Sequence, residues 1–322
     1  MRYYIVKRLL YVVPLLFTIT FLAFLFIHIA PGDFLDSLRL NPQVSRDAIR
    51  LYEEKFCLNK PFLVQYGVWL KNIFSGDLGY SFAYKAPVAR VIAARAANTV
   101  LLALSSLLFT WLIVIPLGVT AALHKNKLID KVLSLCSYVG ISTPAFFWAF
   151  IFLYAATFSG WFPLGGMRSL LFEELSPWQK AGDLLRHLII PVLVLSIGSI
   201  ASLHKILRAH MLEILGSTYI LGARARGLSR TRILYSHALR NALNPMITIF
   251  GYQFADLLSG AALVEIIVGW PGLGQVTLEA VRSQDLYLVM GAMLIGGIML
   301  IAGNLLSDIL LAYADPRIRY QR

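Results

Sequence analysis

The sequence contains few charged residues. Asp, Glu, Lys and Arg together make up 14% of its 322 residues, whereas hydrophobic residues make up 58% and the mean hydropathy is +0.70. A soluble domain has about 25% charged residues and is about 45–50% apolar. This shortage of charge excludes an ordinary soluble globular protein and indicates a chain that lies mostly in a lipid bilayer.

Cysteine is also scarce, and the motifs of common metal and nucleotide sites are missing. Cys57 and Cys136 are far apart and have no metal-ligand neighbours, so we predict neither a disulfide framework nor a zinc site. The six histidines form no His-Glu-x-x-His pattern, and there is no Gly-x-Ser-x-Gly elbow. No Gly-x-x-x-x-Gly-Lys-Ser/Thr phosphate loop occurs anywhere. We therefore expect no enzymatic activity, no metal site and no nucleotide site of that type in this chain.

What the sequence has instead is apolar segments of about 20 residues, the length that crosses a bilayer as a helix. About six such segments predict an all-α polytopic membrane protein that forms one domain over residues 1–322. They lie at about residues 9–30, 99–123, 132–158, 188–207, 245–268 and 287–313. The first begins like a signal peptide, but it is long enough to span and lacks a clear cleavage pattern, so we expect a retained helix.

Basic residues predict the orientation of these spans. With the N-terminus in the cytoplasm, the predicted inner segments hold 16 of the 29 Lys and Arg residues but only three of the 17 acidic residues. Because Lys and Arg near the ends of spans favour the cytoplasmic side, this asymmetry predicts that both termini lie inside. The same rule accounts for the net charge of +12 without any nucleic-acid partner.

The segment between the first two predicted spans, residues 31–98, has mixed charge and scattered aromatic residues. These include Tyr52, Phe56, Trp69 and Phe74. Its apolar residues are too interrupted to cross a membrane. We predict short amphipathic helices that lie on the outer surface of the bilayer.

The longest predicted inner segment, residues 208–244, contains the pattern of a short helix followed by a sharp turn. Ser217 or Thr218 is a candidate cap for a helix over residues 219–226. Gly227 then supplies the left-handed residue that ends this helix.

Ser229 is a candidate cap for a second helix, which leads toward the fifth predicted span. In the first helix, the small residues Ala223 and Ala225 would let a partner approach closely, and Arg224 and Arg226 would supply charge. An ordinary basic loop attracted to anionic lipid is an alternative interpretation of the same residues.

Three acidic residues, Asp256, Glu265 and Asp308, fall within or near the predicted spans. A carboxylate at mid-membrane costs about 2.5–3.5 kcal/mol on insertion scales, so such residues usually face a bundle interior or a hydrated cavity. Asp256 is the deepest, and Tyr252 and Ser259 share its face of the helix. This face is a candidate lining for a transport pathway. The alternative is a structural acid neutralised by a neighbour inside the bundle.

Several short motifs follow one another in a distinctive order. The inner segment contains Ala223-Arg-Ala-Arg-Gly-Leu-Ser and then His237-Ala-Leu-Arg-Asn-Ala-Leu-Asn-Pro245. Others are Pro31-Gly-Asp33, Gly76-Asp-Leu-Gly79, Gly140-Ile-Ser-Thr-Pro144, Trp270-Pro-Gly-Leu-Gly274 and Asp315-Pro-Arg-Ile-Arg319. Over nearly its whole length the chain thus resembles permease subunits of ABC importers, and more narrowly those of the dipeptide/oligopeptide/nickel branch.

The general signature of importer permeases reads Glu-Ala-Ala, three residues, Gly, nine residues and Ile-x-Leu-Pro. Aligned on Gly227, this chain matches that signature at Ala223, Gly227 and Leu239. It departs at other positions, with Leu221 in place of Glu and Arg240 in place of Pro. The departures resemble the peptide branch, in which His-Ala-Leu-Arg-Asn is usual, and they give no support to a role for an acid at position 221.

The resemblance implies a function, partners and site residues. The chain would form half of the translocation pathway of an ATP-driven importer of peptides or related small solutes at a bacterial inner membrane. Its partners would be a second homologous permease, two cytoplasmic ATPases that bind ATP and Mg, and an extracytoplasmic substrate-binding protein. The long outer segment further resembles the first of the two permeases in such systems. The coupling helix that docks on an ATPase would comprise Tyr219, Ala223, Arg224, Ala225, Arg226, Gly227 and Leu228.

The alternative from another class is a stand-alone secondary transporter or channel driven by an ion gradient. In that case Asp256 would be the coupling carboxylate. In the importer, by contrast, Tyr252, Asp256 and Ser259 would line the pathway while the energy comes from another subunit.

Overall fold

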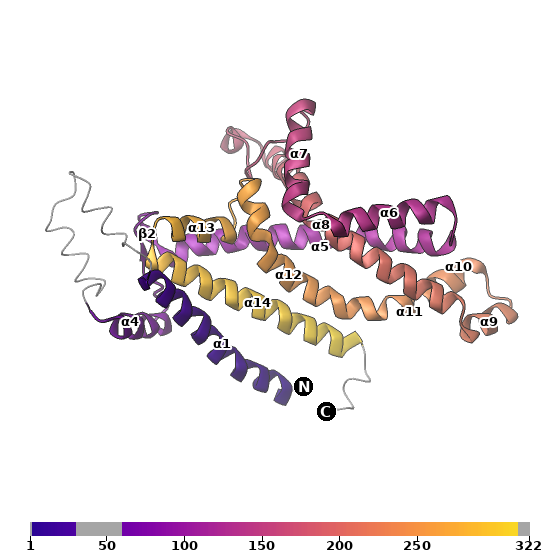
Figure 1. Cartoon of the computed structure of the whole chain (residues 1–322), viewed down its shortest axis with the longest axis horizontal. Coiled ribbons are helices and arrows are strands. Elements are labelled where there is room, and N and C mark those ends of the chain that lie inside the picture. Colours follow the sequence, from indigo (N-terminus) through magenta and orange to yellow (C-terminus); the bar gives the residue numbers. More distant parts are fainter. Residues whose placement is uncertain (1, 30–59, 315–322) are drawn as a thin grey trace. The chain divides into compact units, whose positions relative to one another are not determined.

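The computed structural model describes residues 2–29 and 60–314, with the side chains of residues 2–9 and 307–314 excepted (Figure 1). Also outside the description are the side chains of Ile247, Thr248, Gly251, Ala255, Ser259 and Gly260. The described backbone is helical except for loops and one short hairpin, which confirms the predicted all-α class.

The chain divides into two compact units. Unit 1 comprises Met1–Thr99 and Pro271–Met299, and unit 2 comprises Val100–Trp270 and Leu300–Arg322. Two long helices, α5 (Val88–Leu123) and α14 (Leu286–Ala314), contribute to both units. The predicted single domain over the whole length stays a prediction.

Unit 1 is built on α1 (Arg2–Ile29), α4 (Phe62–Phe74) and α13 (Leu273–Arg282), together with the first part of α5 and of α14. Tyr66 and Trp69 of α4 are buried against Phe24 of α1. The Tyr66 hydroxyl also forms a hydrogen bond with Thr20 Oγ1 at 2.9 Å. A short helix therefore exists in the predicted outer segment, where Phe74 is exposed, while the prediction for residues 31–59, including Tyr52 and Phe56, lies outside the described residues.

A small hairpin in unit 1 was not predicted. Strands β1 (Tyr80–Ser81) and β2 (Ala86–Pro87) pair antiparallel. Ser81 Oγ and the backbone N–H of Ala83 donate to the buried carboxylate of Asp285, at 2.7 and 3.0 Å. The hairpin is thus held by a residue that lies more than 200 positions away in sequence.

Unit 2 contains the elements that carry the predicted site. In chain order they are α6 (Leu128–Ser142), α7 (Ala145–Ser159), the 3₁₀ turn η1 (Phe172–Glu174), α8 (Pro177–Leu215), α9 (Thr218–Ala225), α10 (Arg230–Arg232), the π-helix η2 (Ile233–Leu239), α11 (Arg240–Ala242) and α12 (Asn244–Ile267). The ends of α5 and α14 complete this unit. One apolar core joins α8, α9, η2 and the start of α12, and a second joins α5, α7, α8 and the end of α12.

Helices of spanning length confirm a polytopic membrane protein. Within the described ranges, four helices are long and apolar enough to cross a bilayer, or five if a bent pair counts as one span. The four are Leu10–Ile29, Val88–Leu123, Pro177–Leu215 and Leu286–Leu306. Helix α12 covers the fifth predicted segment with 24 residues, although several of its side chains are not described.

The bent pair corrects the prediction of one uninterrupted span over residues 132–158. Helices α6 and α7 meet at an angle of 107°, and α7 points away from the direction of α6 in Figure 1. Thr143 between them is extended, with φ −102° and ψ 123°. Because Pro144 disfavours helical geometry in the residue before it, the helix stops at Ser142 and restarts at Ala145.

Two helices are longer than their apolar segments predict. Helix α5 starts at Val88 rather than near Thr99, because an Ala-rich stretch with strong helix propensity precedes the apolar run. Helix α8 starts at Pro177, where Ser176 and Gln179 form a reciprocal capping box. It extends to Leu215 and is 39 residues long.

Candidate functional site

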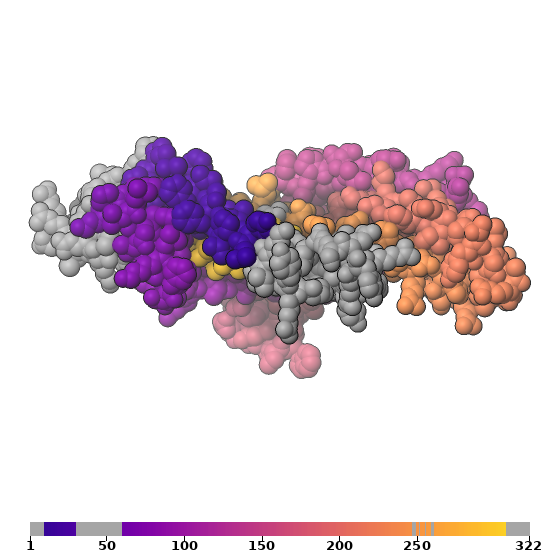
Figure 2. Space-filling view, turned by 90° about the horizontal axis from the view of Figure 1, so that it is seen from below, coloured from indigo at the N-terminus to yellow at the C-terminus, as the bar shows by residue number. Residues whose placement is uncertain are grey.

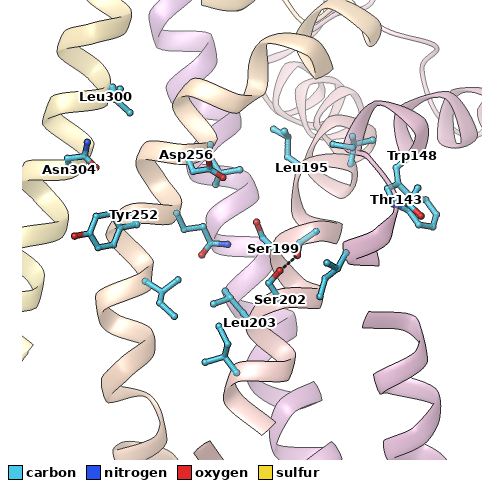
Figure 3. A pocket seen from close by; sticks show the side chains of 18 residues that line it. Thr143, Trp148, Leu195, Ser199, Ser202, Leu203, Tyr252, Asp256, Leu300 and Asn304 are labelled. Carbon is cyan, nitrogen blue, oxygen red and sulfur yellow. Dashed lines mark hydrogen bonds between the residues drawn. The ribbon is translucent and has the colours of Figure 1, made fainter. Parts of the chain in front are cut away.

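An open cleft of about 780 Å³ lies within unit 2 (Figure 3). Its walls come from α8, α12, the α6–α7 junction and the last part of α14. Apolar side chains such as Leu195 and Leu257 form much of the lining. The polar side chains in the cleft are Thr143, Ser199, Ser202, Tyr252, Gln253, Asp256 and Asn304.

Helix α12 supplies the predicted pathway residues to this cleft. Asp256 lies near the middle of the helix, is exposed, and is the single charged residue among those that line the cleft. Tyr252, one turn earlier, is 53% exposed and also lines it. The side chain of Ser259, the third predicted residue, is outside the described residues. The structure therefore brings Tyr252 and Asp256 to one cavity, and their role in transport stays a prediction.

Helix α8 faces Asp256 with a row of serines that sequence reasoning missed. Ser196, Ser199 and Ser202 recur every third position, so they lie along one side of the helix. Ser196 is buried and donates to the backbone carbonyl of Ser106 on α5 at 3.1 Å. Ser199 and Ser202 line the cleft, and Ser202 also donates to the carbonyl of Gly198 at 3.0 Å (Figure 3). The serines recur at this spacing in the apolar middle of α8, and this pattern could have indicated a polar face.

Gln253 is another missed residue of the cleft. Its side chain is 8% exposed, and its Oε1 accepts a hydrogen bond from Trp111 Nε1 of α5 at 3.2 Å. The amide is thereby held in one orientation between α5 and α12. A fixed amide in a cleft wall presents a defined hydrogen-bonding partner to a polar solute.

The predicted helix and turn of the inner segment are confirmed. Helix α9 begins after Ser217, whose backbone is extended, but the predicted side-chain cap is not observed, because Ser217 Oγ donates to the carbonyl of Ile214 at 2.7 Å instead. Gly227 has φ +76°, as predicted. The N–H of Gly227 bonds the carbonyl of Arg224 at 2.9 Å, and that of Leu228 bonds the carbonyl of Ala223 at 3.4 Å. In Figure 1, α9 lies at the far end of α8.

The second predicted helix begins at its expected cap, but the chain after it is not one continuous α-helix. Ser229 Oγ accepts a hydrogen bond from the N–H of Arg232 at 3.4 Å, which confirms the cap. The chain then forms the π-helix η2 before α11 and α12. A π-helix bonds residue i to i+5, so Ile233 and Ala238 point to the same side and both are buried in the core. Such elements are rare and often occur at functional sites.

One hydrogen bond joins α9 directly to η2. Tyr219 Oη and His237 Nδ1 are 2.6 Å apart, and the two rings make an edge contact with centroids separated by 5.7 Å. Because η2 leads through α11 into α12, this contact links the short surface helix to the helix that carries Asp256.

The structure corrects the predicted contact surface of α9. Ala223 is fully buried and packs in the core with Ile220, so this small residue allows a close approach of the chain's own helices, not of a partner. Leu228 is half-buried. The exposed residues of the predicted coupling helix are Tyr219, Arg224, Ala225, Arg226 and Gly227. Figure 2 shows the segment around them, in salmon and orange, uncovered on the face that is drawn. Docking itself stays a prediction.

An ion pair that is largely buried fixes the N-terminal end of α6 on α8. Arg208 Nε and Nη2 donate to the two carboxylate oxygens of Asp130, at 2.5 and 2.7 Å. Asp130 also accepts from the N–H of Asn126 at 2.8 Å. Next to this pair, Ser137 Oγ and His204 Nδ1 form a hydrogen bond of 2.8 Å. Sequence reasoning had placed these charges in the inner segments without pairing them.

No cluster of three or more His, Cys, Asp or Glu side chains suited to a metal ion occurs in the part of the chain that the structure describes. The histidines named above each pair with a hydroxyl group, and Cys136 is a free, exposed residue. The chemistry available in the cleft is therefore that of hydrogen bonding and of one carboxylate.

The chain resembles known transport proteins over almost its entire length. A family model described as "Binding-protein-dependent transport system inner membrane component" matches residues 114–320, and a model for the N-terminal part of such membrane components matches residues 1–105. The oligopeptide transport system permease protein AppB of Bacillus subtilis is 38% identical over 322 residues, covering 99% of this chain and all of that protein. The di/tripeptide transport system permease protein DppB of Pseudomonas aeruginosa is 35% identical over 337 residues, covering 99% of each.

Among solved structures, the inward-facing methionine ABC transporter MetNI gives a TM-score of 0.49 at 16% identity. The match covers 69% of this chain and 96% of that chain. This similarity is too weak to support a conclusion about the present chain.

Proposed function

Because the chain belongs to the family of binding-protein-dependent transport system inner membrane components, we propose that it forms half of the translocation pathway of an ATP-driven importer of peptides or related small solutes. Membership of this family confirms the predicted resemblance to ABC importer permeases. It also confirms that the chain is a multi-pass protein of the inner membrane. A peptide is proposed as the substrate because the chain is similar, over its whole length, to relatives named as oligopeptide and di/tripeptide permeases.

The cleft of unit 2 supports a peptide as the solute. A peptide offers amide donors and acceptors along its backbone, and the hydroxyl and amide groups of Ser199, Gln253 and Asn304 are suited to them. The apolar part of the lining tolerates side chains of different kinds. Asp256 adds a negative charge that favours an amino terminus or a basic side chain.

The connection between α9 and α12 supports a coupling role for α9. In this proposal two partner ATPases bind ATP and Mg in the cytoplasm, and one of them docks on the exposed residues of α9. Movement of α9 reaches η2 through the Tyr219–His237 contact and then α12, which lines the cleft. Binding and hydrolysis of ATP would thus open the cleft alternately to the two sides of the membrane.

Two further partners follow from the same proposal. The cleft is open and not enclosed, as expected of half a pathway whose other half is a second, homologous permease. An extracytoplasmic binding protein would deliver the peptide to this cleft.

The test is uptake by the complex reconstituted in lipid vesicles. Peptide uptake should require hydrolysable ATP, fail with a non-hydrolysable analogue, and continue when ionophores remove all ion gradients. Uptake that needs no ATP and stops with ionophores would contradict the proposal. That result would favour a secondary transporter with Asp256 as the coupling carboxylate.

A further inference from the structure

A second pocket, of about 610 Å³, lies within unit 2 beside α9. Its apolar floor comes from the end of α8, the turn after α9 and η2, and two arginines on α9 and α10 border it. The floor residues are Leu215, Leu228, Ile233 and Leu234, and the arginines are Arg224 and Arg230. None of these six residues lines the 780 Å³ cleft described above.

The charge around this pocket is unbalanced. Between Glu213 and Asp256 the sequence has five arginines and no acidic residue. Arg224 and Arg230 are both exposed, and within the described side chains neither forms an ion pair. Two guanidinium groups beside an apolar floor favour an anionic group, because a charge pair that is partly shielded from water is stronger than one in bulk solvent.

The length of α8 argues against a lipid headgroup as that anion. The uncharged stretch of α8, residues 187–204, would span ~27 Å at 1.5 Å per residue, close to the ~30 Å of the hydrocarbon core. Leu215 follows Lys205 by ten residues, so it lies ~15 Å farther along the helix. The headgroup layer adds only ~5–8 Å on each side. With residues 187–204 in the hydrocarbon core and α8 along the bilayer normal, the pocket would lie beyond the phosphate groups of the bilayer.

We infer that this pocket receives a projecting acidic side chain, flanked by apolar residues, of the ATPase subunit that docks on α9. The inference rests on the proposed function, which supplies the partner. Arginine presents a planar fork that binds a carboxylate through two hydrogen bonds, and the floor of leucine and isoleucine suits the apolar neighbours of the acid. Docking is therefore mutual: α9 enters the ATPase, and a side chain of the ATPase enters this chain.

Cross-linking in the assembled complex tests the contact directly. Arg224→Lys and Arg230→Lys keep the charge but provide an amine that a carbodiimide joins to a carboxylate in contact with it. Each variant, purified with the ATPase subunits that accompany the wild-type chain, should yield a cross-linked peptide containing an Asp or Glu of the ATPase. The matched control is Arg232→Lys, an exposed arginine outside the pocket, which should yield none.

Charge reversal provides a second measurement that does not depend on cross-linking. The double variant Arg224→Glu/Arg230→Glu should bind the ATPase at least about tenfold more weakly, and its affinity should depend less on salt. Arg232→Glu should change the affinity by less than about twofold, as expected for a charge outside the contact. Binding is measured in nanodiscs with and without phosphatidylglycerol.

The outcomes separate the inference from the proposed function. If the wild-type complex performs ATP-driven uptake but the lysine variants form no cross-link to the ATPase, the inference is wrong and the function stands. It is also wrong if reversal at 224 and 230 weakens binding no more than reversal at 232, or if it changes only the retention of phosphatidylglycerol. If the wild-type chain binds no ATPase at all, the proposed function fails first.

Discussion

Gly227 is the residue that allows the chain to turn sharply after α9. Its φ of +76° lies in the left-handed region, which costs a residue with a Cβ roughly 1–2 kcal/mol. A Cβ built at this position meets nothing within 4 Å, so the cost of a substitution arises from the backbone and not from crowding.

Gly227→Val should therefore misplace α9 without preventing membrane insertion. We expect loss of peptide transport and of the stimulation of ATP hydrolysis by substrate, with a normal amount of chain in the membrane. The control is Gly182→Val, because Gly182 is an exposed glycine inside α8 with open space around it and no positive φ. Normal transport by Gly227→Val would show that the turn has no part in coupling.

Asp256 is the single charged residue among the described residues that line the cleft of unit 2, and a neutral substitution separates a role in the pathway from a structural role. Asp256→Asn keeps the size of the side chain while removing the charge. If the carboxylate faces the solute, the variant should transport cationic peptides less well than neutral ones of the same length. Uptake of lysine-containing and glutamine-containing tripeptides, compared at equal amounts of assembled complex, gives this ratio.

The two uptake rates of Asp256→Asn must be compared at equal amounts of assembled complex. A carboxylate that is paired inside a helix bundle destabilises the protein when its charge is lost, and poor assembly imitates a transport defect. An equal loss for both peptides, together with reduced assembly, would remove Asp256 from the pathway and assign it a structural role.

At the scale of elements, the Asp130–Arg208 pair holds α6 on the C-terminal part of α8. The Asp130 side chain is 4% exposed and that of Arg208 is 27% exposed. Arg208→Ala leaves a buried carboxylate without its partner, which we expect to cost about 2 kcal/mol of stability, less than the roughly 3–5 kcal/mol of fully buried pairs. The unfolding temperature of the purified complex in detergent should fall accordingly.

The double variant Asp130→Ala/Arg208→Ala should be compared with Arg208→Ala. With both charges gone no buried charge is left unpaired, so the double variant should be more stable than Arg208→Ala alone. The matched control is Arg186→Ala, an exposed arginine on the same helix. If the double variant is instead less stable than Arg208→Ala, Asp130 stabilises the chain through a contact other than Arg208, such as its hydrogen bond with the N–H of Asn126.

Local signals in the sequence were enough to predict the elements around α9. Ser229 as a cap and Gly227 as a left-handed terminator depend on the conformational preferences of single residues, and both are observed. Pro144 carried an equally local signal for the α6–α7 break, but the long apolar run outweighed it in the prediction. Helix α13 was missed because it has only 10 residues, too few to resemble a span, although its apolar residues recur at helical spacing.

Features that depend on contacts between distant segments could not be predicted from local sequence signals. The β1–β2 hairpin relies on Asp285, and the π-helix η2 relies on a core made with α8 and α9. In the cleft, Tyr252 and Asp256 were found because they share one helix face. Ser199 and Asn304 come from two other helices, and nothing in the spacing of a single helix indicates that they line the same cavity.

At the scale of the whole molecule, the charge asymmetry predicts which side of the membrane each segment faces. The segments predicted to lie inside contain 16 basic and three acidic residues, so the positive-inside rule predicts that α9 and both termini lie in the cytoplasm. The docking proposal requires the same orientation, because the ATPases that would bind α9 are cytoplasmic.

Cysteine labelling in intact cells measures this orientation. In a chain whose Cys57 and Cys136 are replaced by serine, a thiol reagent that cannot cross the membrane should modify Lys60→Cys but not Arg230→Cys. Both positions are exposed, so a difference between them reflects the membrane and not burial within the chain. In cells that lack the partner ATPase subunits, where no docked subunit can shield position 230, a membrane-permeant reagent should modify both. The opposite pattern, with only Arg230→Cys modified by the impermeant reagent, would place α9 outside and contradict both the topology and the docking of an ATPase on this helix.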